Sequence, residues 1–166
     1  MNEALVEAIV TLKTEFMKRN EGGSHIQEIM PTLPESLSID EHELEMLHKF
    51  AESNSIYSSS YEMDIQGAVC NVYEGDVNDY WLDSIKHDTS YAPFYPIWIL
   101  SAYALALESK NLGAKQVVDI GSGDGRIAYC AKVAGLQSYG IEIDENLVGL
   151  ENKISLSTGV DFQPTA

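Results

Sequence analysis

The chain has 166 residues, 45% of them hydrophobic, which suits one folded domain or one domain with an appendage. It carries 26 acidic and 10 basic side chains, a formal net charge of −16, without a cluster of Lys or Arg, which argues against a groove that follows nucleic-acid phosphates. There is no apolar run of the length that a membrane span needs, and no cysteine or histidine pair at metal-ligand spacing. We therefore expect a soluble cytoplasmic protein that binds neither metal, nucleic acid nor membrane.

The first part of the chain, residues 1–90, is predicted to be a mainly helical accessory or cap region. Apolar residues recur every three or four positions over 3–19, which favours a helix that buries one face. Residues 25–30 are expected to add a short turn before Pro31. Ser38 and Glu41 have the spacing of a capping box, which predicts a second helix that ends near Asn54. Such a helical hairpin would serve as a lid or a dimerisation element.

Residues 55–88 are predicted to be irregular, with a short strand over 67–73 and a helix from 76 to about 86. The segment is rich in tyrosine, at positions 57, 61, 73 and 80. Tyrosines in such a segment either line a substrate channel or pack at a seam between domains, where the hydroxyl reaches water. The sequence leaves both interpretations open, and seam packing is the commoner use.

Residues 91–166 read as alternating helices and strands, the pattern of an α/β fold. We expect an apolar helix over 97–109, a strand over 116–120 covered on both faces, a helix over 126–134, a parallel strand over 138–143 and a helix over 146–154. A third strand is expected to begin at 159–162. The predicted fold is therefore a partial Rossmann-like α/β fold with an N-terminal helical cap.

A glycine-rich turn follows the first of these strands. Asp119 stands near the strand end, and Gly121, Gly123 and Gly125 come directly after it. Glycine lets the backbone turn tightly and approach a ligand, because no Cβ is in the way. Glu142, at the tip of the next strand, follows Gly125 by 17 positions, close to the spacing of about 20 that places an acidic side chain on a ribose. This pattern predicts a nucleotide-binding corner.

The spacing of the glycines distinguishes between nucleotides. Dinucleotide sites use G-x-G-x-x-G, whereas this chain has G-x-G-x-G and Arg126 in place of the third dinucleotide glycine. Asp124 is also expected to place negative charge where a pyrophosphate would lie. Both features disfavour NAD and FAD, and an NAD-dependent oxidoreductase is the weaker alternative.

The strings VVDIGSGDG and YGIEID resemble the first motif and the second strand of class I, seven-β-strand methyltransferases that use S-adenosylmethionine. The resemblance implies that Asp119 lies under the methionine end of the cofactor, that Gly121, Ser122, Gly123 and Gly125 wrap it, and that Glu142 holds its ribose. Ile143, next to Glu142, is expected in the same cofactor site. The segment YAPFYP upstream resembles the archaeal and mitochondrial protein lysine methyltransferases. That narrower resemblance adds Tyr91, Pro93 and Tyr95 to the expected cofactor site.

A complete enzyme of that family needs well over a hundred residues after its first motif begins, whereas 48 remain here from Asp119 onward. We therefore expect a fragment or a degenerate relative that supplies the cofactor-binding half of a methyltransferase, with no catalytic residue to name. The expected substrate is a lysine-containing basic protein. A non-catalytic module that acts in dimerisation or regulation is the alternative, because an open strand edge can pair with a second copy.

Overall fold

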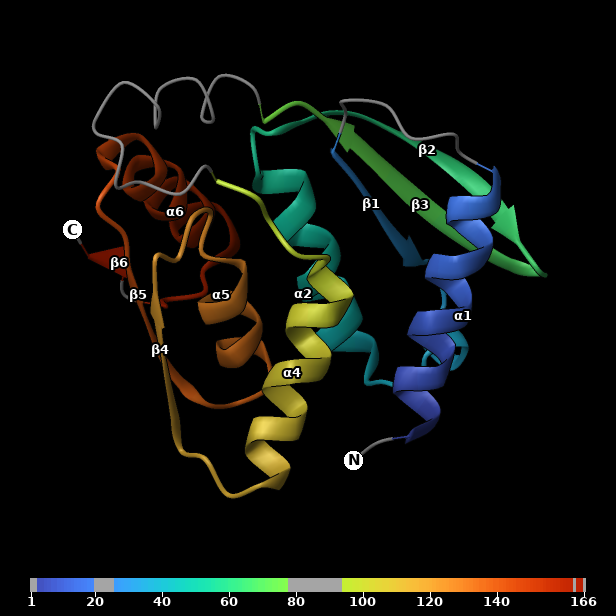
Figure 1. The fold of residues 1–166 in the computed structure, drawn as a ribbon, viewed down its shortest axis with the longest axis horizontal. Coiled ribbons are helices and arrows are strands. Elements are labelled where there is room, and N and C mark those ends of the chain that lie inside the picture. Colours follow the sequence, from blue (N-terminus) through green and yellow to red (C-terminus); the bar gives the residue numbers. More distant parts are fainter. Residues whose placement is uncertain (1–2, 20–25, 78–93, 163, 166) are drawn as a thin grey trace.

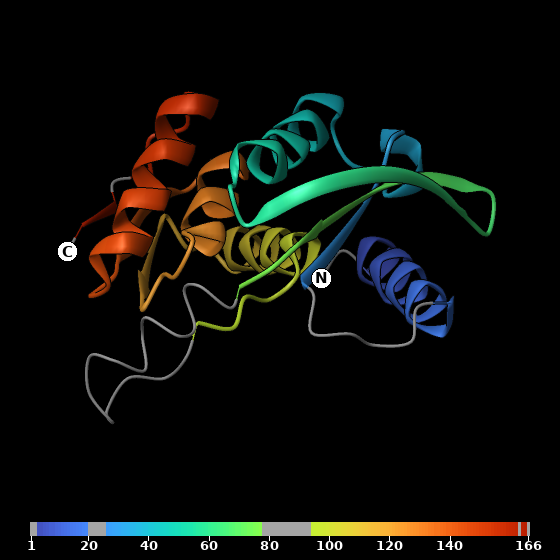
Figure 2. The ribbon, with the colours of Figure 1, turned by 90° about the horizontal axis from the view of Figure 1, so that it is seen from above.

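The computed structural model describes residues 3–19, 26–77, 94–162 and 164–165. Within these ranges the protein has an α/β fold with two separate three-stranded sheets (Figure 1). The N-terminal part of the chain forms an antiparallel sheet, and the C-terminal part forms a parallel one. The helices α2, α4 and α5 lie between the two sheets (Figures 1 and 2).

The antiparallel sheet has the strand order β1-β3-β2. Its strands are β1 (Ile26–Pro31), β2 (Tyr57–Ile65) and β3 (Ala68–Gly75), and the helices of this part of the chain are α1 (Glu3–Arg19), the 3₁₀ helix η1 (Pro34–Ser36) and α2 (Glu41–Ser53). A two-residue turn joins β2 to β3, and both of its residues have positive φ, 54° at Gln66 and 87° at Gly67. That conformation matches the twist of a β-hairpin, so the turn fixes the register of the two strands.

The parallel sheet has the strand order β4-β5-β6. Its elements follow the chain as α4 (Ile99–Asn111), β4 (Gln116–Ile120), α5 (Arg126–Val133), β5 (Gln137–Ile141), α6 (Glu145–Thr158) and the two-residue strand β6 (Pro164–Thr165). Asp119 of β4 is in register with Gly140 of β5. The carboxyl ends of β4 and β5 therefore meet at one edge of the sheet, where the Gly-rich turn begins.

One continuous apolar core joins the two sheets. α1 contributes a stripe of buried residues at the helical spacing expected from the sequence, and α2 does the same. Rings from both halves of the chain meet in the core: Phe50 of α2 lies 4.9 Å from Tyr129 of α5, measured between ring centroids, and Tyr129 lies 5.9 Å from Phe162. The N-terminal part is therefore packed into the same core as the parallel sheet.

The expectation that residues 1–90 are mainly helical is wrong for the described part of this region. Residues 26–31, expected as a turn, form β1, and residues 57–65, expected to be irregular, form β2. The short strand expected over 67–73 is confirmed as β3. The second helix begins two residues later than a cap at Ser38 predicts. Asp40 caps it instead, because Ser38 has φ 53° and the Asp40 carboxylate accepts from the N–H groups of His42 and Glu43. Asp76 and Val77 are not helical, and the remainder of the helix expected there lies outside the described residues.

The elements expected in residues 97–154 are all present, with ends shifted by a few residues. Two details differ. The third strand forms at Pro164–Thr165 rather than at 159–162, where Phe162 is instead buried in the core. The expected burial of both faces of β4 is wrong: α5 and α6 pack on one side of the sheet, and Val118 and Ile120 on the other side are 49% and 81% exposed. The described sheet is thus parallel but is not a clear Rossmann sheet.

Candidate functional site

The Gly-rich turn, residues 121–125, leaves the carboxyl end of β4 and leads into α5. Gly121, Gly123 and Gly125 have φ values of 76°, 64° and 78°, which side chains other than glycine rarely adopt. A Cβ at Gly125 would lie 2.5 Å from the Phe162 ring, and one at Gly123 would lie 2.4 Å from the Phe94 ring. A Cβ at Gly121 would meet no atom within 4 Å. The turn is therefore open at Gly121 and closely packed at the other two glycines.

Most backbone donors of the turn are already used inside the protein. The N–H groups of Gly121 and Ser122 donate to the carbonyl of Ile141, and that of Gly125 donates to the carbonyl of Ser122. Gly123 donates to Glu142, and the N–H of Arg126, the first residue of α5, donates to the Asp124 carboxylate. An anion at a helix N-terminus needs such N–H groups to be free. The turn is thus poorly suited to hold a phosphate.

The turn does present an unsatisfied acceptor. Asp119 is half-buried near the end of β4, and its Oδ2 atom is buried without a hydrogen-bond partner among the described residues. Burial raises the pKa of Asp119, and the nearby carboxylates of Asp124 and Glu142 raise it further. A cationic or hydroxyl-bearing ligand would satisfy this oxygen, because a buried acceptor without a donor is costly.

Glu142 stands at the carboxyl edge of the sheet, directly after β5, as the sequence predicted. Its Oε2 accepts from the N–H of Gly123 at 2.7 Å, and its Oε1 accepts from the N–H groups of Ile143 and Asp144 at 2.7 and 3.0 Å. The carboxylate therefore links the Gly-rich turn to the residues that follow β5. A carboxylate has about four acceptor positions, so these three bonds leave capacity for one further donor.

Asp124 does not face a ligand, and the argument from its charge against a pyrophosphate is wrong. Its side chain is fully buried and lies under the turn, where Arg126 Nη2 donates to Oδ2 at 2.5 Å and Asn54 Nδ2 donates to the same oxygen at 2.8 Å. Its charge is therefore neutralised inside the protein. The occupied N–H groups of the turn, rather than Asp124, now disfavour a dinucleotide.

Ser122 also points into the protein. Its hydroxyl is buried against Gly140 of β5, beside the buried carboxyl of Glu151 of α6. Burial raises the pKa of Glu151 to about 7; the Ser122 hydroxyl opposes the shift, and Glu142, Asp124 and Asp119 add to it. A neutral carboxyl thus lies beneath the turn at mildly acidic pH. Nothing in the sequence pattern marked Glu151 as part of this site.

The aromatic segment before α4 reaches the turn through Phe94, which the sequence pattern did not mark as a site residue. Tyr91 and Pro93 lie outside the described residues, and Tyr95 is 88% exposed. Phe94 is the side chain that lies over Gly123, because its ring occupies the space that a Cβ there would need. Ile143, also expected at the cofactor, is exposed beside Glu142. The structure therefore brings Asp119, the glycines and Glu142 together at one corner and adds Phe94 to them.

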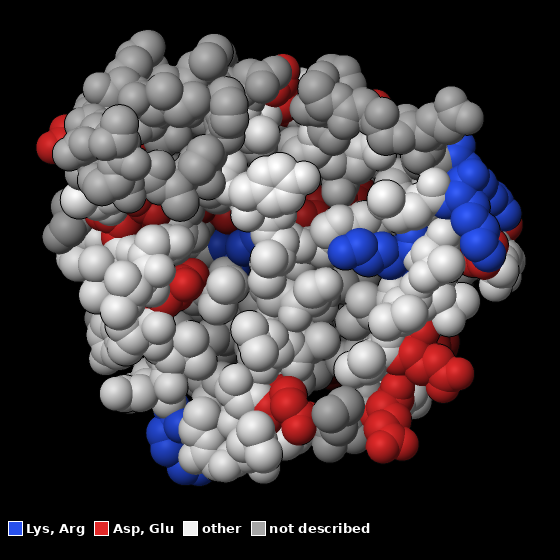
Figure 3. Space-filling model, viewed as in Figure 1, with Lys and Arg blue, Asp and Glu red and all other residues white. Residues whose placement is uncertain are grey.

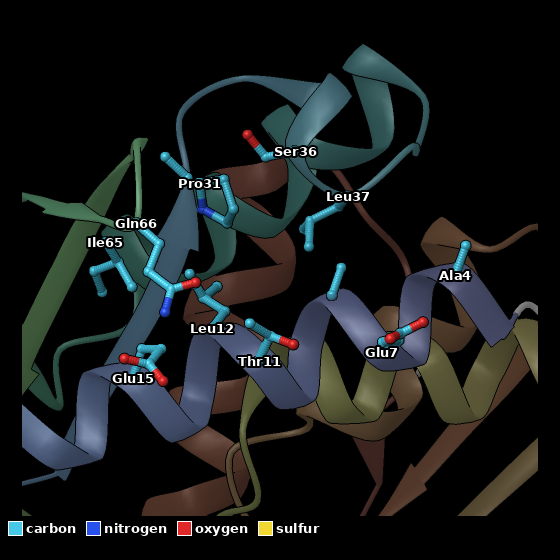
Figure 4. Close-up of a pocket in the computed structure, with 12 residues that line it drawn as sticks. Ala4, Glu7, Thr11, Leu12, Glu15, Pro31, Ser36, Leu37, Ile65 and Gln66 are labelled. Carbon is cyan, nitrogen blue, oxygen red and sulfur yellow. The ribbon is translucent and has the colours of Figure 1, made fainter.

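A separate groove lies at the other end of the molecule. It has a volume of about 440 Å³ and runs between α1 and the turn that joins β2 to β3, with Leu37 on its far wall (Figure 4). The side chain of Gln66 points from this turn toward α1, near Glu15 (Figure 4). The residues that line the groove come from α1, η1 and the antiparallel sheet, and none belongs to the Gly-rich turn. The groove is therefore not part of the candidate site.

The described residues contain no group of three or more His, Cys, Asp or Glu side chains arranged to hold a metal ion. None of the helices in the described ranges is long and apolar enough to cross a bilayer. No family model matches the chain, and no curated protein or solved structure is significantly similar to it. The candidate site therefore has to be interpreted from its own geometry.

Proposed function

We propose that the Gly-rich turn binds S-adenosylmethionine and that this chain supplies the cofactor-binding half of a methyltransferase. The observation that carries the proposal is the polarity of the turn. Five of its backbone N–H groups, counting that of Arg126, donate to acceptors within the protein, while the buried Asp119 oxygen lacks a donor. Such a site favours a ligand that brings positive charge and hydroxyl donors over one that brings phosphates.

S-adenosylmethionine has the groups that this polarity requires. Its ammonium group and its ribose hydroxyls are donors, and its sulfonium adds positive charge. Burial and neighbouring carboxylates disfavour the ionised form of Asp119, so a cation nearby would stabilise that form. Glu142 keeps one acceptor position for a ribose hydroxyl, and the open space at Gly121 lets a ligand approach the backbone. NAD fits the turn less well, because its pyrophosphate would need the occupied N–H groups.

The proposed reaction is methyl transfer to a protein lysine. S-adenosylmethionine supplies an electrophilic methyl group. A lysine amine that has lost its proton forms the new N–C bond while the C–S bond breaks, the electron pair of that bond stays on sulfur, and the methylated amine releases a proton to solvent. The role of a site in such chemistry is to align the two atoms and exclude water. The acidic composition of the chain, with a net charge of −16, favours a lysine-rich substrate.

A non-catalytic association module is the second candidate. The observation that favours it is the side of the parallel sheet that faces away from α5 and α6, where Val118, Ile120, Ile141 and Ile143 are exposed. Figure 3 shows a broad area with few charged side chains over β4 and α4. Sedimentation equilibrium tests this candidate. A homodimer with no affinity for S-adenosylmethionine would favour it over the methyltransferase.

Calorimetric titration with S-adenosylmethionine, S-adenosylhomocysteine and NAD tests the proposed cofactor. The Asp119→Asn variant keeps the shape of the side chain but loses its charge, so we expect its Kd for S-adenosylmethionine to rise by about tenfold or more. Asp40→Asn is the matched control, because Asn caps a helix as well as Asp does and Asp40 is the N-cap of α2. Tight binding of NAD, without response to either adenosyl ligand, would refute the proposal.

A further inference from the structure

Arg126, at the start of α5, binds the neighbouring Asp124 and groups from distant parts of the chain. It is buried, and its guanidinium donates to Asp124, to Glu28 of β1, to Tyr57 of β2 and to the carbonyl of Ile97. These bonds use Nε and both Nη atoms. A guanidinium has five N–H donors in a fixed planar arrangement, so it can hold several partners in one geometry.

The partners of Arg126 are themselves linked. Glu28 Oε1 accepts from Arg126 Nη1 at 2.6 Å and from the Tyr57 hydroxyl at 3.3 Å, and its Oε2 accepts from the N–H of Ile99, at the start of α4, at 2.9 Å. Asn54 reaches Asp124 from the end of α2. We call Glu28, Asn54, Tyr57, Asp124 and Arg126 the Arg126 cluster.

The Arg126 cluster fixes the Gly-rich turn from beneath. Asp124 lies within the turn, and its carboxylate is held by Arg126 Nε at 2.9 Å and by Asn54 Nδ2 at 2.8 Å. On the opposite side, Glu142 holds the N–H of Gly123. A buried charge that loses its partner is strongly destabilised, so the turn cannot shift without breaking bonds to β1, β2 and α2. The antiparallel sheet is thus attached to the turn through Arg126, and the end of α2 is attached to it directly through Asn54.

We infer that Glu28, Asn54 and Tyr57 are positioning residues that hold the Gly-rich turn in its ligand-binding shape. This assigns a role to the N-terminal part of the chain: its sheet and the end of α2 pre-organise a turn that lies about 70 to 100 residues later in the sequence. The inference builds on the proposed function, because its effect on affinity requires that the turn bind S-adenosylmethionine. Its effect on the turn itself does not.

The test compares pairs of identical substitutions on the same sheet. Tyr57→Phe removes only a hydroxyl of the Arg126 cluster, and Tyr61→Phe removes a hydroxyl on the same strand that donates to Glu74 instead. Glu28→Gln and Glu74→Gln form a second pair, since Glu74 binds Gln27 and Tyr61 away from the turn. Two readouts are measured at a temperature where each variant is folded by circular dichroism: amide hydrogen exchange at Gly123 and Gly125, and the Kd for S-adenosylmethionine.

We expect Tyr57→Phe to speed exchange at both glycine amides by about tenfold and to raise the Kd by about threefold or more, with larger effects for Glu28→Gln. Tyr61→Phe and Glu74→Gln should change each value by less than about twofold. If Glu28→Gln does not fold, the comparison of Tyr57→Phe with Tyr61→Phe tests the inference by itself. Equal exchange rates and affinities in the two tyrosine variants would overturn the inference. Selective loosening of the turn in a protein that does not bind S-adenosylmethionine would support the inference and refute the proposed function.

Discussion

At the scale of single residues, the carboxyl of Glu151 links the stability of the fold to pH. Burial of this side chain beneath the turn raises its pKa to about 7, compared with 4.5 for a free glutamate. At pH values between these two pKa values, the folded state binds more protons than the unfolded state. This group therefore makes the free energy of unfolding fall as pH rises from about 5 to 7. The cost is fully present only when the pH is well above 7, where the carboxyl is ionised in both states.

The Glu151→Gln variant should remove this dependence. Glutamine is similar in size and stays neutral, so we expect the variant to gain stability relative to the native chain as pH rises from 5 to 8. One pKa unit corresponds to about 1.4 kcal/mol, so the gain is at most about 3 kcal/mol. Urea unfolding at four pH values measures it. Glu62→Gln, at an exposed position of β2, is the control and should show no such trend; the same trend in both variants would contradict the prediction.

The residues of the Gly-rich turn could be predicted because they lie in one short stretch and the chemistry of each is local. The positive φ values of Gly121, Gly123 and Gly125 follow from the need for a tight turn after a strand. The partners of Asp124 could not be predicted in the same way. Asn54 and Arg126 donate hydrogen bonds to its carboxylate in place of water, and Asn54 lies 70 residues away in the sequence. A carboxylate that faces a ligand and one that is buried against an arginine look alike in the sequence.

At the scale of elements, β4 alternates between a buried and an exposed side. Val117 packs against the core, while Val118 and Ile120 point away from α5 and α6. A run of β-branched residues favours a strand but does not reveal whether both of its faces are covered. For the same reason the sequence indicated the β4 strand correctly and its burial incorrectly.

The exposed side of β4 leads to a prediction about stability. Val118→Thr places a hydroxyl at a position that solvent already reaches, so we expect the free energy of unfolding to change by less than about 0.5 kcal/mol. Val72→Thr, at a fully buried position of β3, should cost about 1–3 kcal/mol, because the hydroxyl loses its hydrogen bonds to water. Thermal unfolding compares the two variants. An equal loss of stability in both would mean that another part of the protein, or a second copy, covers this side of the sheet.

The strands β2 and β3 show why only one strand of the N-terminal sheet was predicted, the one over 67–73 that corresponds to β3. Their sequence contains few apolar residues on the β2 side, where three consecutive serines precede Tyr61, and the turn between them is Gln-Gly rather than the more familiar Asn-Gly. Tyr57 and Tyr73 pack at the seam between this sheet and the rest of the molecule: Tyr57 bonds to Arg126, and Tyr73 bonds to His48 of α2. Of the two interpretations of the tyrosines, these contacts favour the seam.

At the scale of the whole molecule, the core and the Arg126 cluster join the two parts of the chain into one cooperative unit. Buried residues from Leu5 to Phe162 belong to a single apolar cluster. Glu28 and Asp124, which lie in different parts of the chain, share one guanidinium. Separating the two parts would break the buried ion pair of Glu28 with Arg126 and the bond of Asn54 to Asp124, and breaking a buried ion pair costs several kcal/mol, which is comparable to the whole stability of a small domain.

We therefore predict that the chain unfolds in one transition and that residues 94–166 do not fold alone. In urea, far-UV circular dichroism and tryptophan fluorescence should give coincident curves, as two-state unfolding requires. Hydrogen exchange adds a local measurement, because Val72 of β3 and Gly140 of β5 should open with the same free energy if both open only by global unfolding. The isolated fragment should have the spectrum of an unfolded chain, since Arg126 and Asp124 would lack Glu28, Asn54 and Tyr57. A folded fragment, or two separate transitions, would instead show that the parallel sheet is an independent domain to which the N-terminal region is only appended.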